Sequence, residues 1–207
     1  MSTEKIAAID GDGVLVDYRQ HYANAWFNAF GEKLTVHDPS SWYATRYWGA
    51  PHLSGAELQR LRSKGFNHHH WRTMPAMPGA VQAVRQLYNA GWTIVCVTAL
   101  DEEFATARLA NLHHLGMPIA KVIATGSGSS PLQSPKASAL QLLRPDLFVD
   151  DYAAYFQGLP NLPRMHKVLI DPQTFSDSPN ARILSQQPQL VDATAPSLSH
   201  LISSLLS

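Results

Sequence analysis

The chain has 207 residues, and its sixteen Lys and Arg residues balance sixteen Asp and Glu residues, so the formal net charge is zero. This balance lacks the basic excess that binding to a nucleic acid polymer needs, so we expect a small substrate. No apolar run approaches the ~20 residues of a membrane span, which argues against a membrane partner. The first predicted strand begins within six residues and no apolar signal region precedes it, so we expect a cytoplasmic protein. The length is typical of one domain with an insertion.

The first predicted strand ends in two carboxylates. Residues 6–9 are apolar, and Asp10-Gly11-Asp12-Gly13 follows them. A short apolar run predicts a buried strand, and glycines let the backbone turn sharply after it. Paired acids at a strand end can bind a hard cation such as Mg2+, or act as a nucleophile and a proton carrier. From these residues alone, a solvated turn is an equally good interpretation.

Residues 18–76, called the insertion below, have no strong strand pattern and are predicted to be helical. Asp17 is placed to cap a helix that begins at Tyr18 and ends at Gly31, and Ser54 and Glu57 have the spacing of a second helix cap. The insertion is rich in aromatic residues, which either pack its own core or face a cleft and stack on an organic leaving group. The residues in question are Trp42, Tyr43, Tyr47, Trp48 and Trp71.

Three consecutive histidines, His68 to His70, cannot share one face of a helix. We therefore predict an exposed polar turn, with one histidine reaching the substrate as the alternative.

From residue 77 onward, predicted helices alternate with predicted strands. Pro78 is expected in the first turn of one helix, and Lys136 opens another. The strands are expected at 92–98, 121–124, 147–151, 166–171 and, shortest of all, 190–191. Such alternation predicts a parallel sheet, whose ligands gather at the carboxyl ends of the strands. Five polar residues fall at such ends: Asp10, Asp12, Thr98, Asp150 and Asp151.

These residues, in this order, resemble the four motifs of the haloacid dehalogenase superfamily of aspartate-nucleophile phosphohydrolases. The motifs match Asp10 to Val14, Thr98, Lys136, and Asp150 with Asp151. The resemblance implies an α/β fold with a Rossmann-like three-layer parallel sheet. Residues 1–17 and 77–207 would form this core, and the insertion would be a small α-helical cap that closes over a small-molecule substrate.

The same resemblance implies a catalytic role for each matched residue. Asp10 corresponds to the nucleophile, and Asp12 to the general acid and base. Thr98 corresponds to the hydroxyl that holds the transferring phosphoryl group. Lys136 corresponds to the cation that steadies the nucleophile and the phosphate.

The resemblance also implies a Mg2+ cofactor. Asp10 corresponds to a ligand through its carboxylate and Asp12 to a ligand through its carbonyl, while Asp150 and Asp151 correspond to the pair that positions the metal. Which member of that pair binds directly is left open. The need for a cation follows from charge, because a phosphate dianion and a carboxylate nucleophile repel each other.

We therefore expect a Mg2+-dependent phosphatase that hydrolyses a small phosphomonoester through an aspartyl-phosphate. A fainter similarity to the cytosolic deoxyribonucleotidases makes a nucleotide one candidate substrate. The dehalogenase branch has no acid at the position of Asp12, since a halide leaving group needs no proton. A phosphomutase and a catalytically silent phosphate-binding protein remain as alternatives, and the sequence leaves the substrate and the oligomeric state open.

Two departures from the family pattern carry expectations of their own. Gly11 stands where a bulkier apolar residue is usual, so a looser loop is expected there. Tyr152-Ala153-Ala154-Tyr155 follows the acidic pair, so a third acid that would support the metal ligands is missing.

Overall fold

The computed structural model describes residues 4–128 and 133–207. In these residues six parallel strands form one sheet, in the order β3-β2-β1-β4-β5-β6. The strands are Lys5–Ile9 (β1), Trp92–Thr98 (β2), Lys121–Ala124 (β3), Leu147–Asp150 (β4), His166–Ile170 (β5) and Ala193–Ala195 (β6). The predicted α/β fold with a parallel sheet is confirmed.

The strand predicted at 190–191 is wrong, because β6 begins three residues later. Leu190 and Val191 pack instead against the apolar cluster that also contacts α7 (Ala137–Leu143) and α8 (Pro179–Gln186). Asp192 then accepts a hydrogen bond from the backbone N–H of Lys167 at 2.7 Å, and the pairing with β5 begins after it.

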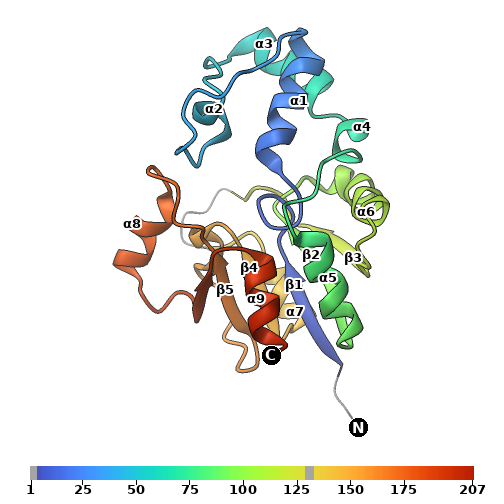
Figure 1. Ribbon diagram of the computed structural model, residues 1–207, viewed down its shortest axis with the longest axis vertical. Coiled ribbons are helices and arrows are strands. Elements are labelled where there is room, and N and C mark those ends of the chain that lie inside the picture. Colours follow the sequence, from blue (N-terminus) through green and yellow to red (C-terminus); the bar gives the residue numbers. More distant parts are fainter. Residues whose placement is uncertain (1–3, 129–132) are drawn as a thin grey trace.

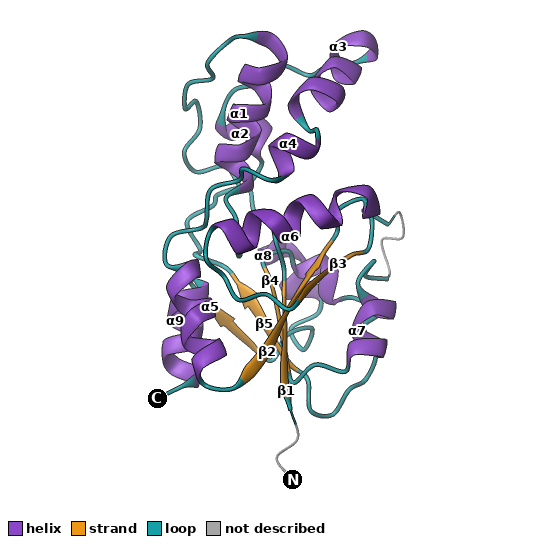
Figure 2. Cartoon of the chain, turned by 90° about the vertical axis from the view of Figure 1, so that its right-hand side faces the viewer, coloured by secondary structure: helices purple, strands orange, loops and turns teal. Residues whose placement is uncertain are grey.

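Helices cover both faces of the sheet and make three layers (Figures 1 and 2). In β1, Ala7 and Ile9 face one apolar cluster, whereas Ala8 faces the other. The first cluster includes helices α5 (Ala80–Asn89), α6 (Ala105–His114) and α9 (Leu198–Leu205); the second includes α7 (Ala137–Leu143) and α8 (Pro179–Gln186). Pro78 lies before α5 and not in its first turn, since Gly79 in a left-handed conformation precedes the helix.

All residues of the insertion are described, and none of them lies in a strand. It contains α1 (Tyr18–Phe30), α2 (Ala44–Tyr47), α3 (Gly55–Arg60), a π-helical turn (Leu61–Gly65) and α4 (His68–Trp71). These helices stand beyond the carboxyl ends of the strands (Figure 2). As predicted, Asp17 caps α1 by accepting a hydrogen bond from the N–H of Gln20 at 2.9 Å, and Gly31 ends it. The second predicted helix is α3, and Ser54 is its N-cap residue as predicted, but the Ser54 side chain makes no capping hydrogen bond with any described residue.

The prediction of an exposed turn at the three histidines is wrong for His70. Asn67 caps α4 through the N–H of His70 at 3.0 Å, and this turns the His70 ring toward α1. The ring is 2% exposed and stacks on the ring of His21, with 3.5 Å between centroids. His68 and His69 are exposed, as predicted. No helix of the described residues has both the length and the apolar character that crossing a membrane requires.

Candidate active site

The matched acids meet because β1 and β4 are neighbours in the sheet. The N–H of Asp10 donates to the carbonyl oxygen of Val149 at 2.9 Å, which carries the pairing past the last residue of β1. Asp10 and Asp150 therefore leave adjacent strands at the same edge. Thr98 ends β2 on the other side of β1, and all three side chains are buried.

Lys136 joins the two strands electrostatically. It lies just before α7, and its fully buried ammonium group contacts Asp10 Oδ1 and lies 2.6 Å from Asp150 Oδ2. Burial opposes a charge here, but the carboxylates of Asp10 and Asp150 raise the pKa of Lys136 above its usual range. The ammonium group is therefore a fixed positive charge between the two acids.

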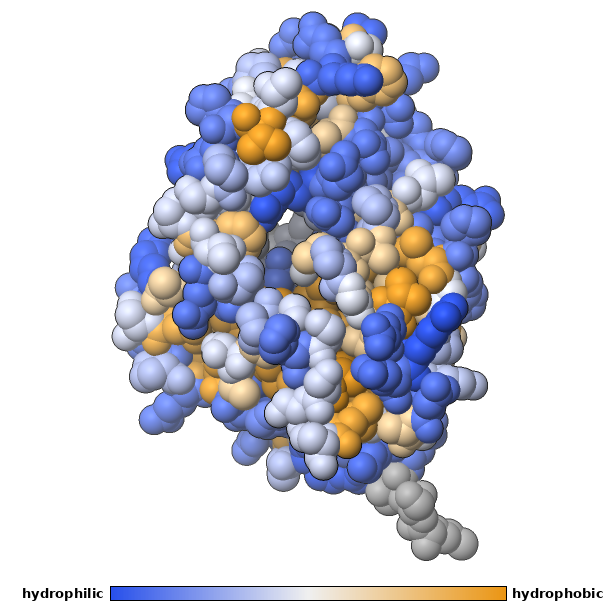
Figure 3. Space-filling view, viewed as in Figure 1, coloured by the Kyte–Doolittle hydropathy of each residue, from blue (hydrophilic) through white to orange (hydrophobic). Residues whose placement is uncertain are grey.

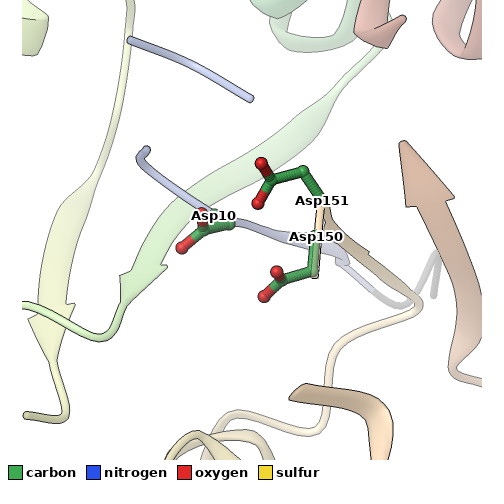
Figure 4. A group of neighbouring side chains, drawn as sticks. All are labelled: Asp10, Asp150 and Asp151. Atoms are coloured by element: carbon green, nitrogen blue, oxygen red, sulfur yellow. The ribbon is translucent and has the colours of Figure 1, made fainter. Parts of the chain in front are cut away.

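Figure 4 shows three carboxylates gathered at the ends of β1 and β4, and Lys136 forms ion pairs with two of them. Asp10, Asp150 and Asp151 each offer an oxygen, and these oxygens lie within 4.8 Å of one another. Burial, opposed by Lys136 and reinforced by Asp150 and Asp12, raises the pKa of Asp10 to about 7. Burial also raises the pKa of Asp151, and its carboxylate neighbours Asp10 and Asp150 add to the effect.

This donor set fits a divalent cation. Among the described residues, four carboxylates, counting Asp12, face two buried cations, Lys136 and Arg108, so two carboxylates have no cation of their own. Burial is the main cause of the raised pKa values of Asp10 and Asp151, and the neighbouring carboxylates add to it. Oxygen ligands with net negative charge suit Mg2+.

Asp12 stands apart from the three clustered carboxylates. Its carboxylate accepts a hydrogen bond from Arg108 Nη2 at 2.7 Å, and its side chain is 31% exposed while that of Arg108 is fully buried. Sequence reasoning missed Arg108, which lies on the buried face of α6. Gly11 departs from the family pattern, but nothing in the sequence connects it with Arg108.

The expectation that Gly11 loosens the loop is wrong. The carbonyl oxygen of Gly11 accepts hydrogen bonds from the N–H groups of Leu15 and Val16, both at 2.9 Å, so the loop is tied across its base. A Cβ atom at Gly11 would lie 2.3 Å from Arg108 Nη1. The glycine therefore provides the space in which the guanidinium of Arg108 lies.

A second glycine fits the loop against the acidic pair. Gly13 has a φ of +81°, and a Cβ atom there would lie 2.1 Å from Asp151 Oδ2. Behind Asp151, the buried Asn180 of α8 donates to the carbonyl oxygen of Asp151 at 2.9 Å and accepts from the N–H of Ala153 at 2.8 Å. Asn180 thus supports the loop after the acidic pair, where the sequence shows no third acid. Its distance along the chain left no sequence signal for this contact.

A cavity of about 920 Å3 lies between the insertion and the sheet. Figure 3 shows a hollow between the upper and lower parts of the molecule. Of the predicted residues, Asp10, Asp12, Thr98 and Asp151 line the cavity, whereas Lys136 and Asp150 lie buried behind them. All five aromatic residues singled out in the insertion line it too. Trp71 also packs in the main core and Trp48 against the insertion's own cluster, so these rings both pack apolar clusters and line the cavity. Stacking on an organic leaving group stays a prediction.

No family model and no curated protein sequence matches the chain. Solved structures do match over nearly their whole length. A HAD family hydrolase from Deinococcus radiodurans, with bound phosphate and sodium, is 15% identical with a TM-score of 0.60, covering 98% of this chain and 94% of its own. The L-2-haloacid dehalogenase from Xanthobacter autotrophicus is 12% identical with a TM-score of 0.56, covering 99% of both chains. The D,D-heptose 1,7-bisphosphate phosphatase from B. bronchiseptica, complexed with magnesium and phosphate, is 15% identical with a TM-score of 0.54, covering 98% of both.

The order of the strands and the acids at their carboxyl ends agree with the fold of these structural neighbours. The chain has the fold of the haloacid dehalogenase superfamily.

Proposed function

We propose that the chain is a Mg2+-dependent phosphatase that hydrolyses a small phosphomonoester through an aspartyl-phosphate on Asp10. The observation that carries the proposal is the buried ion pairing of Lys136 with Asp10 and Asp150, beside the oxygens of Asp151 and at the floor of the cavity. This arrangement holds a nucleophilic carboxylate next to a fixed positive charge. It also leaves net negative charge for a divalent cation to offset.

Asp10, Asp150 and Asp151 would hold the Mg2+ ion through their carboxylates, and Asp12 would add its carbonyl oxygen. When bound, the ion supplies positive charge that offsets the repulsion between the phosphate dianion and the attacking carboxylate. Lys136 opposes the rise that burial causes in the pKa of Asp10, so it favours the ionised carboxylate and fixes its orientation. The Thr98 hydroxyl, which lies at the cavity wall, would donate to a phosphoryl oxygen.

In the first step, an Asp10 carboxylate oxygen attacks phosphorus and the bond from phosphorus to the leaving oxygen breaks. Asp12 gives its proton to that leaving oxygen. In the second step, Asp12 takes a proton from a water molecule, which attacks the aspartyl-phosphate and releases inorganic phosphate. The two steps replace one difficult displacement.

The cavity favours a substrate with a planar aromatic or nucleoside leaving group. Tyr18, Trp42 and Trp48 of the insertion and Tyr152 and Phe175 of the core all line it. The rings of Trp42 and Tyr152 lie together, with 5.4 Å between their centroids. Rings of this kind stack on a flat leaving group and exclude water from it. In this proposal the insertion acts as the cap of the site, with core segments 1–17 and 77–207 on the other side.

The test is phosphate release from p-nitrophenyl phosphate and from a panel of nucleoside monophosphates, with Mg2+ and with chelator. Asp10→Asn should lower turnover by at least about a thousandfold, because it removes the nucleophile. The matched control is Asp192→Asn, at the opposite end of the strands, which should leave activity unchanged. Ordinary Mg2+-dependent turnover by the Asp10→Asn protein would refute the assignment of the nucleophile.

The neighbour from Xanthobacter autotrophicus is named a dehalogenase, so a second function needs its own test. An aspartate nucleophile could displace a halide, but such a reaction has no use for a proton carrier at Asp12. Halide release from 2-chloropropionate, unaffected by Asp12→Asn, would favour the dehalogenase. Isomerisation of a sugar phosphate with little free phosphate would instead favour a phosphomutase.

A further inference from the structure

Arg108 reaches the site from a helix that no matched motif includes. Its side chain is fully buried, yet Nη2 donates to Asp12 Oδ1 at 2.7 Å. The guanidinium carbon lies 5.3 Å from the centroid of the Trp71 ring, so the group contacts both a carboxylate and an indole. The Arg108 side chain therefore has little freedom to move.

The loop that carries Asp12 is shaped around this arginine. A Cβ atom at Gly11 would meet Nη1 at 2.3 Å and the hydroxyl of Thr98 at 3.2 Å. Gly11 does not have a positive φ, so its backbone conformation does not require glycine. The space taken by Arg108 is therefore the reason that the structure gives for a glycine between the two acids.

Burying Arg108 beside Asp12 also costs free energy, because some of its hydrogen-bond donors have no partner in the described part of the chain. Nε and Nη1 of Arg108 are buried and have no hydrogen-bond partner among the described residues. A buried donor without a partner costs roughly 1–3 kcal/mol. A shape-matched apolar side chain in this place would avoid that cost, so the guanidinium has a use other than filling space.

We propose that Arg108 is a positioning residue that holds the Asp12 carboxylate toward the cavity for proton transfer. The proposal rests on the proposed function, in which Asp12 moves protons. Asp12 is partly exposed and follows a glycine, so without Arg108 its side chain would be free to turn among rotamers. Arg108 acts through Asp12 and does not itself line the cavity.

A double-mutant cycle tests this with p-nitrophenyl phosphate, whose leaving group departs without a proton, so that Asp12→Asn keeps a measurable rate. Arg108→Met should lower kcat by on the order of 10- to 100-fold with KM nearly unchanged, because a misplaced proton carrier slows the chemical step. In the Asp12→Asn background the same change should lower kcat by less than about twofold. If the fold-losses in kcat of Arg108→Met and Asp12→Asn multiply in the double variant, Arg108 acts independently of Asp12 and the proposal is overturned.

Two further variants guard against misfolding of Arg108→Met. Arg108→Lys keeps a positive charge and should recover part of kcat. Gly11→Ala leaves both partners in place but pushes Nη1 aside, so it should lower kcat in the wild-type background and have little effect beside Arg108→Met. The matched control is Arg85→Met, since Arg85 also lies against a glycine, Gly116, but away from the cavity. It should leave kcat unchanged.

The two proposals fail in different ways. Wild-type protein that releases no phosphate from any substrate would overturn the proposed function and this inference with it. An active wild type in which Asp12→Asn is slow but Gly11→Ala and Arg108→Met are as active as Arg85→Met would overturn this inference alone.

Discussion

At the scale of single residues, the site depends on two glycines, which have no side chain and so leave space for their neighbours. Gly11 leaves room for Arg108, and Gly13 leaves room for the carboxylate of Asp151. Neither requirement is visible in the chain itself, because the atoms that need the space come from distant segments. Gly13 follows β1 and Asp151 follows β4, and the two residues lie in contact because these strands are neighbours in the sheet.

Gly13→Ala should weaken Mg2+ binding. The new Cβ atom would lie 2.1 Å from Asp151 Oδ2, so the carboxylate must leave its present position beside Asp10 and Asp150. Binding of Mg2+ to the native state alone stabilises a protein by about 2.7 kcal/mol when the ion is a hundredfold above its dissociation constant. The rise in melting temperature on adding Mg2+ measures this, and it should shrink in the variant.

Gly91→Ala is the control for this experiment. Gly91 has a similar φ of +85°, but no heavy atom of the described residues lies within 4 Å of the Cβ position. Both variants should lose roughly 1 kcal/mol from left-handed strain, and only Gly13→Ala should lose the response to Mg2+. An equal response to Mg2+ in the two variants would contradict the contact with Asp151.

At the scale of elements, the insertion contacts the core in several places. Helix α4 packs on α6, where Asn111 donates to the carbonyl oxygens of Arg72 and Met74. Two further connections lie beside the cavity. One is the chain itself on either side of the insertion, where Val16 and Ala76 pair. The other, called the latch below, joins residues 40–46 to residues 175–177. In it Asp177 accepts hydrogen bonds from the N–H of Trp42 at 2.6 Å and the hydroxyl of Ser41 at 2.7 Å. Both connections border the cavity, so its shape depends on them.

Removing the latch should weaken substrate binding without changing the chemistry. Asp177→Ala loses both hydrogen bonds to this charged carboxylate, each worth at least about 1.5 kcal/mol, so KM should rise at least on the order of tenfold while kcat changes little. Steady-state kinetics with the best substrate of the panel measures both. Glu57→Ala, which removes an exposed acid elsewhere in the insertion, should change neither. An unaltered KM in Asp177→Ala would show that the latch does not control access.

At the scale of the whole molecule, the strands could be predicted because each is a short apolar run with a clear end. Those ends placed Asp10, Thr98 and Asp150 together without knowledge of the strand order, since parallel strands end at one edge. The contacts of Arg108, Asn180 and Asp177 could not be predicted. Each depends on how a helix or loop packs against a segment far away in the chain, and periodicity along the chain carries no information on that.

The buried histidines show the same limit and lead to a prediction on acid stability. Burial lowers the pKa of His21 from 6.5 to about 2, with His70 and Arg108 adding to the effect. Burial also lowers the pKa of His70 from 6.5 to about 4. Below pH 6.5 the two rings bind protons in the unfolded chain but stay neutral in the folded protein. Each ring therefore lowers the free energy of unfolding as the pH falls. From pH 7.5 to pH 5 the loss is roughly 2 kcal/mol for each ring.

His21→Phe isolates this contribution. The raised pKa values of Asp10, Asp150 and Asp151 act in the opposite direction, so the measured quantity is the difference between variant and wild type. His21 Nε2 is buried without a partner among the described residues, so the variant should be at least as stable as the wild type at pH 7.5. At pH 5 it should retain roughly 2 kcal/mol more of its stability in urea unfolding. His52→Gln, at an exposed position, should follow the wild type at both pH values. Parallel losses in His21→Phe and wild type would show that the ring is protonated in the folded protein.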